Sequence, residues 1–270
     1  MSERDVRLSL ILPVYRGADW IAENLRTVTK CLEGLEGGFE LIVVCDGDND
    51  HASHEARSCA AGDERIRVFH YPQNQGKGFA VSFGVAQATG QLIGWLDADL
   101  DIDPSAILHQ VARFDEGEID AAIGSKRHKG SSVDYPATRR IYSFGYQLLV
   151  RALFGLSVRD TQVGAKVFSR EMLSTVNPLL LCKQHAFDLE VLAVGAEFGF
   201  DRVVEVPVQL AYRFSGTSIN WRAVFNILLD TLAIGYRLHF RHWYAKRFAD
   251  QLRSERTAKA RRRGMRRVAA

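Results

Sequence analysis

Four aspartates stand at alternate positions from Asp97 to Asp103, directly after an apolar run at residues 92–96. Such a run is typical of a buried strand, so the carboxylates follow that strand's carboxyl end. In an extended chain alternate residues share one side, and close carboxylates repel one another unless a cation lies between them. A hard divalent ion needs few protein carboxylates when a diphosphate supplies the other oxygens. We therefore interpret Asp97 and Asp99 as metal or nucleotide ligands, and Asp103, which precedes Pro104, as a helix cap.

Other sites that use aspartates or glycines do not fit this chain. An EF-hand loop counted from Asp97 would need glycine where Ile102 stands and glutamate where Leu108 stands. The Gly76-Lys77-Gly78 segment lacks the full frame of a phosphate loop, and no G-x-G-x-x-G follows the first predicted strand.

Short apolar runs alternate with amphipathic stretches along the first half of the chain, and this predicts the elements that position the aspartates. Strands are expected at residues 8–14, 41–45, 66–71, 92–96 and 121–124, and helices at 20–32, 51–61, 78–88 and 104–114. In the second half, helices are expected at 139–154 and 186–198, and strands at 163–168 and 202–208. The alternation favours an α/β fold with a mostly parallel sheet covered on both faces. Ligands of such sheets bind beyond the carboxyl ends of the strands, where the aspartates stand.

The composition excludes several classes of protein. Of 270 residues, 47% are hydrophobic and 25% are charged, which excludes wholesale disorder, collagen and coiled coil. The four cysteines are scattered with no C-x-x-C pair, so a disulfide framework or a zinc ribbon is not expected and a reducing compartment fits best.

A set of short motifs accompanies the aspartates and covers about residues 7–215. They are Leu12-Pro13-Val14-Tyr15, Val44-Cys45-Asp46-Gly47-Asp48, Asn74-Gln75-Gly76-Lys77-Gly78, Asp97-Ala98-Asp99, Gly124-Ser125-Lys126-Arg127, Arg139-Arg140 and Asp160-Thr161-Gln162-Val163-Gly164. In this order they resemble the family-2 glycosyltransferases of the GT-A fold, and within them the polyprenyl-phosphate sugar synthases, such as dolichyl-phosphate mannose and glucose synthases. Two stretches depart from the family pattern: Arg16-Gly17 replaces Asn-Glu, and Cys45-Asp46-Gly47-Asp48 replaces Asp-Asp-Gly-Ser.

The resemblance implies an inverting transfer of a hexose from a nucleotide-sugar to a polyprenyl phosphate. It assigns Asp99 and Asp160 to the reacting centre and Asp97, Asp99 and Asp101 to a Mg²⁺ or Mn²⁺ ion. That ion would stabilise the charge on the departing nucleotide. Residues expected to bind the nucleotide-sugar are Pro13, Tyr15, Asp46, Asp48, Lys77, Asp97 and Gln162.

A phosphate acceptor needs positive charge rather than a base, because its second pKa is about 6 and it is largely anionic at neutral pH. Basic side chains that could bind it, with a hydroxyl one turn further on, are Lys126, Arg127, Arg139, Arg140 and Ser143. The Asp-Thr-Gln-x-Gly form resembles the glucose-type branch of the family more than the mannose-type branch, which implies a UDP-hexose donor. Alternatives are GDP-mannose as donor, or a hydroxyl acceptor in polysaccharide synthesis with Asp188 or Glu190 as base. A non-enzymatic adaptor is disfavoured by the intact aspartates.

Residues 223–240 form an apolar stretch long enough to raise the question of a membrane span. Asn226, Asp230 and Arg237 interrupt it at helical spacing, and a central aspartate would cost about 2.5–3.5 kcal/mol in a bilayer. A broad apolar face remains, made of Phe225, Leu228, Leu229, Leu232 and Tyr236. This pattern predicts an interfacial helix, with a helix packed on the catalytic domain as the alternative.

The net charge of +3 is unevenly distributed. Residues 245–270 hold ten basic and two acidic side chains, a net of +8, and leave −5 for the rest of the chain. Each basic residue near anionic lipid is worth about 1 kcal/mol, so we expect the tail to bind an anionic membrane surface. Nucleic acid is not expected as a partner, since no aromatic residue is interleaved after Phe248. We therefore predict a GT-A catalytic domain at residues 1–217 and a helix with a basic tail at 218–270. Without a secretory signal, the chain is expected at the cytoplasmic face of a membrane as a peripheral protein.

Overall fold

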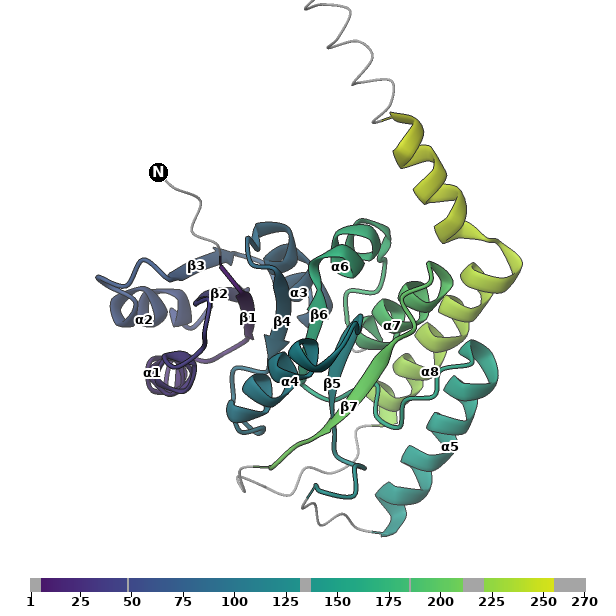
Figure 1. Ribbon diagram of the computed structural model, residues 1–270, viewed down its shortest axis with the longest axis horizontal. Coiled ribbons are helices and arrows are strands. Elements are labelled where there is room, and N and C mark those ends of the chain that lie inside the picture. The colour runs from purple at the N-terminus through teal and green to yellow at the C-terminus, as the bar shows by residue number, and fades with distance from the viewer. Residues whose placement is uncertain (1–5, 48, 132–136, 185, 211–220, 255–270) are drawn as a thin grey trace, which may run out of the picture.

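The computed structural model describes residues 6–47, 49–131, 137–184, 186–210 and 221–254, except for the side chains of residues 137–143 and 221–223. It confirms the α/β fold with a mostly parallel sheet (Figure 1). The strand order is β3-β2-β1-β4-β6-β5-β7, and β6 runs antiparallel to both of its neighbours. The strands are β1 Leu8–Val14, β2 Phe39–Asp46, β3 Ile66–Tyr71, β4 Leu92–Leu96, β5 Ala121–Ser125, β6 Ala165–Ser169 and β7 Val203–Pro207.

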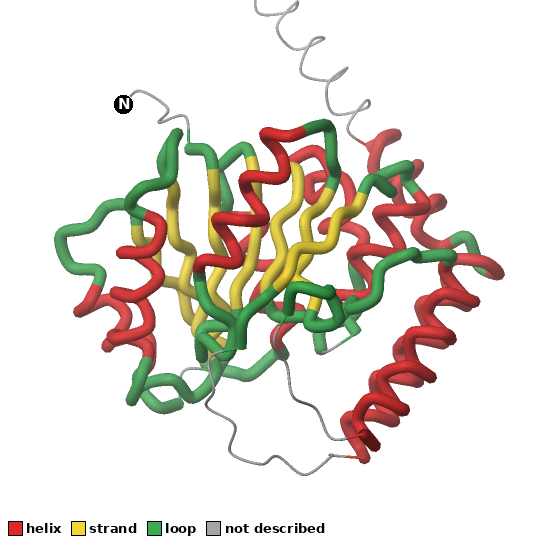
Figure 2. Tube along the Cα trace, turned by 60° about the horizontal axis from the view of Figure 1, so that its bottom comes forward, coloured by secondary structure: helices red, strands yellow, loops and turns green. Residues whose placement is uncertain are grey.

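Helices cover both faces of the sheet (Figure 2). They are α1 Ile21–Leu32, α2 Ala52–Cys59, α3 Lys77–Gln87, α4 Ser105–Glu116, α5 Ala137–Phe154, α6 Arg170–Val176, α7 Phe187–Glu197 and α8 Trp221–Gly235, with a 3₁₀ turn at Asn177–Leu179 and a π-helical turn at Tyr236–Phe240. Side chains alternate across the pleated strands, which explains how both faces are filled. Leu10 and Leu12 of β1 pack with α1, α2 and α4, whereas Ile11 packs with α3, α6 and α7 on the other face.

The parallel strands β1, β2 and β4 bring three of the motifs to one edge of the sheet. Val14, the last residue of β1, pairs with Cys45 of β2, and Ile11 of β1 pairs with Trp95 of β4. All eight residues of β2 are buried, as expected for a parallel strand covered on both faces. The segments that follow these three strands therefore lie next to one another.

The second half of the chain differs from the predicted elements in two places. Helix α6 follows β6 directly and was not predicted; Ser169 caps it by accepting a hydrogen bond from the backbone N–H of Met172 (3.2 Å). The apolar stretch that begins at Trp221 is not one helix. It passes through the π-helical turn, breaks at His242, which has a positive φ of 46°, and continues as a helix over residues 243–254.

The C-terminal helices pack on the sheet domain through part of their surface. Ile234, Leu238 and Tyr244 are buried in the same core as α3, α6 and α7. On α8, Thr231 is also buried, and its hydroxyl lies 3.0 Å from the hydroxyl of Tyr146 on α5. Among the helices of the described chain, none combines the length and the hydropathy that a bilayer crossing requires.

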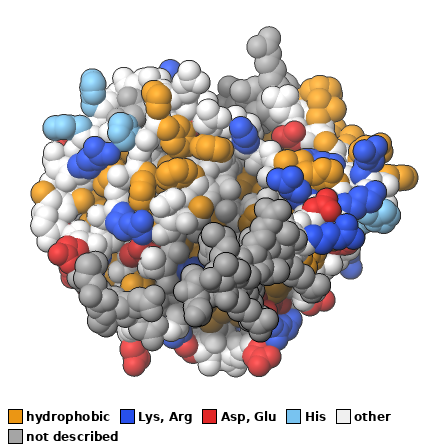
Figure 3. Space-filling view, turned by 90° about the horizontal axis from the view of Figure 1, so that it is seen from above, with side chains coloured by type: hydrophobic (Ala, Val, Ile, Leu, Met, Phe, Trp, Pro, Cys, Tyr) orange, Lys and Arg blue, Asp and Glu red, His pale blue; other side chains and the backbone are white. Residues whose placement is uncertain are grey.

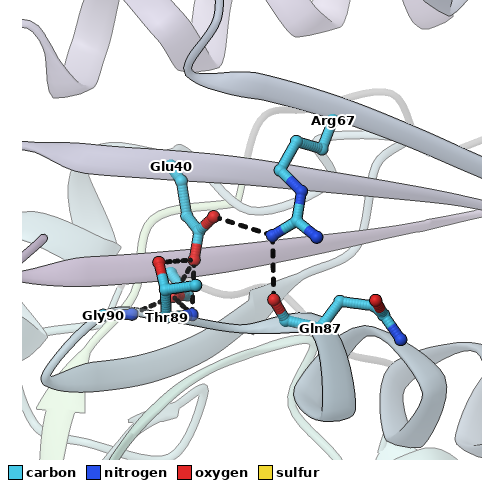
Figure 4. Close-up of polar contacts among 6 residues, drawn as sticks. Glu40, Arg67, Gln87, Thr89 and Gly90 are labelled. Atoms are coloured by element: carbon cyan, nitrogen blue, oxygen red, sulfur yellow. Dashed lines mark hydrogen bonds and ion pairs between the residues drawn. The ribbon is translucent and has the colours of Figure 1, made fainter. Parts of the chain in front are cut away.

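The buried carboxylate of Glu40 lies at the edge of the sheet where β1 and β2 begin, which is opposite the edge that carries the motifs (Figure 4). Glu40 Oε1 accepts hydrogen bonds from the hydroxyl of Ser9 (2.6 Å) and from the backbone N–H of Thr89 (2.6 Å). Its other oxygen lies 3.1 Å from Arg67, which also donates to the carbonyl of Gln87 (2.8 Å). The group thus joins β1, β2, β3 and the end of α3.

We predict that Glu40→Gln lowers the free energy of unfolding by about 2 kcal/mol, because the buried donors lose a charged acceptor. Burial alone would raise the pKa of Glu40, but the hydrogen bonds from Ser9, Thr89 and Arg67 lower it below its ordinary value of 4.5. The stabilisation by the ionised Glu40 carboxylate is therefore complete above pH 4.5. It is lost as the pH falls through the lower pKa that Glu40 has in the folded state. Urea unfolding across this pH range measures the difference.

The matched control is Glu36→Gln on an exposed turn. It should change stability by less than about 0.5 kcal/mol at every pH. A difference between wild type and Glu40→Gln that stays constant down to pH values well below 4.5 would contradict the assigned electrostatic contribution.

Candidate active site

A cleft of about 400 Å³ opens beyond the carboxyl ends of β1, β2 and β4. Six residues expected from the sequence line it: Pro13, Tyr15, Asp46, Lys77, Asp97 and Asp99. The lining also includes Trp20, Asn74 and Gln184, to which the sequence analysis assigned no role. The volume lies within the range of small-molecule and nucleotide sites. The cleft is therefore the candidate active site.

The residues that follow β1 form one wall of the cleft, which contains the aromatic ring of Tyr15. Tyr15 is 48% exposed, and the guanidinium carbon of Arg16 lies 5.2 Å from its ring centroid. A Cβ atom on Gly17 would lie 2.8 Å from the ring of Trp20, so a larger residue there would displace the indole. The departure from the family pattern at Arg16-Gly17 thus accompanies a tryptophan that takes part in the cleft wall.

Asp46, at the end of β2, lies in the cleft wall with both carboxylate oxygens engaged. They accept hydrogen bonds from the backbone N–H groups of Gln75 (2.6 Å) and Gly76 (2.8 Å). The neighbouring Gly47 has a φ of 72°, and a Cβ there would lie 2.6 Å from the nitrogen of Asn74. In this structure Asp46 therefore positions the loop of residues 74–76; the expected contact of Asp46 with the nucleoside stays a prediction. Asp48 lies outside the described residues.

The aspartates after β4 do not share one side of an extended chain. Leu100 has a positive φ of 55°, and its N–H donates to the carbonyl of Asp97 (3.2 Å), which closes a turn. Asp101 donates its backbone N–H to Asp99 Oδ1 (3.2 Å) and is not among the described residues that line the cleft. The turn breaks the alternation, so Asp97 and Asp99 line the cleft together and Asp101 does not; the assignment of the three aspartates to an ion stays a prediction.

Asp97 is held by two neighbours. Its backbone N–H donates to the carbonyl of Gly164 (2.9 Å), and its Oδ1 lies 2.6 Å from Nζ of Lys77. A Cβ on Gly164 would lie 2.1 Å from Asp97 Oδ2, so glycine is required there for the carboxylate to keep its place. This contact joins the motif of residues 160–164 to the acidic motif.

The acidic pair fits a divalent ion that takes most of its ligands from a diphosphate. Across the described ranges, no three His, Cys, Asp or Glu side chains gather into a set that could hold a metal by themselves. Burial and the neighbouring carboxylate of Asp97 raise the pKa of Asp99, so a cation would stabilise its ionised form. The ammonium of Lys77 already occupies such a position beside Asp97. Two hard carboxylates plus diphosphate oxygens satisfy Mg²⁺ or Mn²⁺.

A row of alternating charges extends from Asp97 into the core. Lys77 Nζ lies 4.0 Å from Asp188 Oδ2, and Asp188 Oδ1 lies 2.5 Å from Nζ of Lys166. Trp95 donates its indole N–H to the same carboxylate (3.1 Å). Burial would raise the pKa of Asp188, but Lys166 and Lys77 together lower it. Asp188 is therefore a fully paired anion.

Neither of the carboxylates considered as a base for a hydroxyl acceptor is exposed. Asp188 is paired as just described, and Glu190 is completely buried. Glu190 accepts hydrogen bonds from the backbone N–H groups of Leu181 and Cys182 and from the hydroxyl of Tyr244. Both carboxylates considered as a base are therefore bonded inside the protein in this structure. Helical periodicity places a residue on a face of a helix, but it does not show that α7 is buried on nearly all sides.

Asp160 and Gln162 line a second, smaller pocket of about 80 Å³ with Tyr146 and Gln147 of α5. Asp160 accepts the backbone N–H of Lys126 and that of Gln162, each at 3.3 Å. The Nε2 atom of Gln162 is buried and has no hydrogen-bond partner among the described residues. A buried side-chain NH₂ group without a partner favours binding of a ligand that carries a hydrogen-bond acceptor.

The basic residues expected to bind the acceptor lie around this smaller pocket as far as they are described. Lys126 contacts Asp160 through its backbone, and Arg127 donates to the side-chain oxygen of Gln147 (2.5 Å). Arg139, Arg140 and Ser143 belong to α5, but their side chains lie outside the described residues. The structure thus separates the expected site residues into the cleft and the smaller pocket, joined where Gly164 contacts Asp97.

Comparison with known proteins identifies a family and a fold. The family model described as "Glycosyl transferase family 2" matches residues 9–176. Glycosyltransferase AglD of Haloferax volcanii is 34% identical over 205 residues, which are 75% of this chain and 33% of that protein. Dolichyl-phosphate beta-glucosyltransferase of Dictyostelium discoideum is 26% identical over 243 residues, which are 84% of this chain and 69% of that protein. The chain thus spans a third of the Haloferax volcanii protein and about two thirds of the Dictyostelium discoideum protein.

A solved structure shares the GT-A fold. Glucosyl-3-phosphoglycerate synthase of Mycobacterium tuberculosis, in complex with Mn²⁺, UDP and its product, superposes with a TM-score of 0.63 at 18% identity. The match covers 86% of this chain and 79% of that one. Another structure of the same enzyme holds Mg²⁺ and UDP.

We predict that Gly164→Ala weakens binding of UDP with Mn²⁺ about tenfold or more, equivalent to about 1.4 kcal/mol. The added methyl group would overlap Asp97 Oδ2 and force the carboxylate away from the cleft. Isothermal titration calorimetry measures the affinity. Gly34→Ala, where a Cβ meets nothing within 4 Å, is the control and should bind as wild type does. Equal affinities of Gly164→Ala and wild type would show that the position of Asp97 does not matter for the ion or the diphosphate.

Proposed function

The chain belongs to glycosyl transferase family 2, and from this premise we propose that it transfers a hexose from a nucleotide-sugar to a polyprenyl phosphate at the cytoplasmic face of a membrane. The observation that carries the proposal is the cleft beyond β1, β2 and β4. It combines the exposed ring of Tyr15 with the acidic pair Asp97 and Asp99 and the cation of Lys77. A nucleoside diphosphate needs these three features: an aromatic surface for the base, an ion site and a positive charge for the phosphates.

UDP-hexose is the proposed donor. The likeness to a dolichyl-phosphate beta-glucosyltransferase and the shared fold with an enzyme solved with UDP support it. Asp97 and Asp99 would hold the divalent ion, which neutralises charge on the departing diphosphate. Burial alone would lower the pKa of Lys77, but Asp97 and Asp188 raise it, so the side chain stays charged beside the diphosphate. GDP-mannose is the alternative donor.

A phosphate is proposed as the acceptor, in preference to a hydroxyl group. A hydroxyl acceptor must lose a proton to a nearby base, whereas a phosphate monoester is already anionic at neutral pH. Asp188 and Glu190, the two bases considered, are buried and bonded. The smaller pocket offers Asp160 and the Nε2 atom of Gln162, which has no hydrogen-bond partner in the described part of the chain, for orientation beside Lys126 and Arg127. Arg139, Arg140 and Ser143 at the start of α5 complete the proposed phosphate site.

An exposed apolar surface is the proposed contact with the membrane. All five apolar residues expected on one helical face are exposed: Phe225, Leu228, Leu229 and Leu232 of α8 and Tyr236 at the start of the π-helical turn. Phe144 and Leu148 of α5 are also exposed, at 61% and 60%. Soluble monomers rarely expose so many apolar side chains together. In Figure 3, hydrophobic side chains lie among Lys and Arg side chains on the side that carries these helices. Because α5 would carry both the phosphate site and part of this surface, the lipid and its phosphate would reach the enzyme together.

The proposed reaction is tested with the full chain, Mg²⁺ or Mn²⁺, a panel of nucleotide-sugars and a short polyprenyl phosphate, with products identified by mass. We expect hexosyl transfer from one donor, and a loss of more than about 100-fold in Asp99→Asn, because the ion loses a charged ligand. The exposed Asp201→Asn is the control and should react as wild type does. No transfer from any donor, together with unchanged nucleotide binding in Asp99→Asn, would contradict the proposal.

The proposed membrane contact is tested with vesicles that contain phosphatidylserine. Leu229→Gln with Leu232→Gln should weaken binding about tenfold or more, because two exposed apolar side chains can no longer enter the headgroup region. Arg26→Gln on α1, at the other end of the molecule in Figure 1, is the control and should leave binding unchanged. Truncation after Ser254 removes seven basic residues and should abolish the salt dependence. Vesicle binding that is equal in all variants would contradict the proposed membrane contact of the apolar surface and that of the basic tail.

A further inference from the structure

Glu190 connects the C-terminal helices to the inside of the domain. It lies on α7 and is completely buried. Its Oε1 accepts a hydrogen bond from the hydroxyl of Tyr244 (2.5 Å) and lies 3.4 Å from Arg237. Tyr244 is itself 1% exposed, although it follows the break at His242. Glu190, Arg237 and Tyr244 are called the Glu190 cluster below.

The other carboxylate oxygen of Glu190 holds a loop. Glu190 Oε2 accepts the backbone N–H groups of Leu181 (2.9 Å) and Cys182 (2.7 Å). Arg237 also reaches this loop, because its Nη2 lies 3.6 Å from the sulfur of Cys182. Burial and the nearby Glu190 carboxylate raise the pKa of Cys182 to about 12, so the thiol adds no second negative charge. The loop of residues 181–184 is therefore held by groups from α7 and from the C-terminal helices.

The far end of the same loop forms part of the cleft. Gln184 lines the cleft, and the carbonyl of Lys183 accepts the backbone N–H of Phe79 (3.3 Å). The packing is tight: a Cβ on Gly76 would lie 2.4 Å from the carbonyl oxygen of Lys183 and 2.6 Å from the side chain of Gln184. Gly76 immediately precedes Lys77, whose ammonium pairs with Asp97. A shift of the loop would therefore disturb the segment that carries the cation of the cleft.

We propose that the Glu190 cluster positions the loop of residues 181–184 against the nucleotide cleft, so that the C-terminal helices set the affinity for the donor. This inference rests on the proposed function of the cleft as the donor site. Arg237 and Tyr244 are positioning residues, since they act on the cleft through Glu190 and the loop. The cleft then depends on residues beyond the segment 9–176 that the family model matches. It also depends on the helices whose exposed face is the proposed membrane contact, so membrane binding and donor binding would be coupled.

The experiment compares Tyr244→Phe and Arg237→Met with Phe248→Leu in the full chain. Phe248 packs on Phe198 with ring centroids 4.9 Å apart, so its variant weakens the same C-terminal helix without a contact to Glu190. Binding of UDP with Mn²⁺ is measured by calorimetry, and thermal stability by the melting temperature. We expect the first two variants to raise the dissociation constant about fivefold or more, and Phe248→Leu to leave it unchanged at a similar melting temperature.

Two further readouts separate positioning from general destabilisation. Hydrogen exchange at the amides of Leu181 and Cys182 should become faster in Tyr244→Phe and Arg237→Met but not in Phe248→Leu. In turnover assays the donor KM should rise while kcat and the acceptor KM stay unchanged.

The outcomes distinguish this inference from the proposed function. If the wild-type chain binds no nucleoside diphosphate with either Mg²⁺ or Mn²⁺, the proposed function fails and the inference fails with it. If the wild type binds but Tyr244→Phe and Arg237→Met bind equally well, the inference alone is overturned. It is also overturned if Phe248→Leu weakens binding as much as they do at the same loss of thermal stability.

Discussion

The row of charges Asp97, Lys77, Asp188 and Lys166 is the interaction on which the site depends. It joins the residue that follows β4, the start of α3, the start of α7 and the start of β6. Burial lowers the pKa of Lys166, and Asp188 offsets this only in part, so the pair is held together at an energetic cost. Apolar residues could fill the same volume, but they would not place an ammonium group beside Asp97. The row therefore determines where the cleft carries positive charge.

Close backbone contacts complete this arrangement. Gly164 lies against Asp97, Gly76 lies against Lys183, and Gly47 lies against Asn74. Each contact brings a loop that follows one strand against a loop from elsewhere in the chain. Asp46 accepts hydrogen bonds from Gln75 and Gly76, and these bonds hold the loop of residues 74–76 in place. The glycines of the motifs thus determine which loops can meet at the carboxyl edge of the sheet.

Much of this could be predicted from the sequence, and the failures have physical causes. Apolar runs and their spacing predicted the strands and the edge at which the site lies. Periodicity carries no signal for strand direction, so the antiparallel β6 could not be foreseen. The resemblance assigned Asp101 to the ion beside Asp97 and Asp99, but a turn with a positive φ at Leu100 follows Asp99, and this turn could not be foreseen from the alternation of aspartates. Asp188 and Glu190 were considered as alternative bases because their pairing partners, which are distant in sequence, cannot be recognised from a single chain.

The C-terminal helices show why two alternatives need not exclude each other. The apolar stretch of residues 223–240 predicts either an interfacial helix or a helix packed on the domain. Thr231, Ile234 and Leu238 are buried, whereas Phe225, Leu229 and Leu232 are exposed on the same helical segment. An amphipathic pattern normally has one apolar face and one polar face. Here two apolar faces lie on one element, one packed on the domain and one exposed. A helix held in this way by Glu190 and the core can bring an exposed apolar surface to a lipid without separating from the cleft, which a flexibly attached anchor could not do.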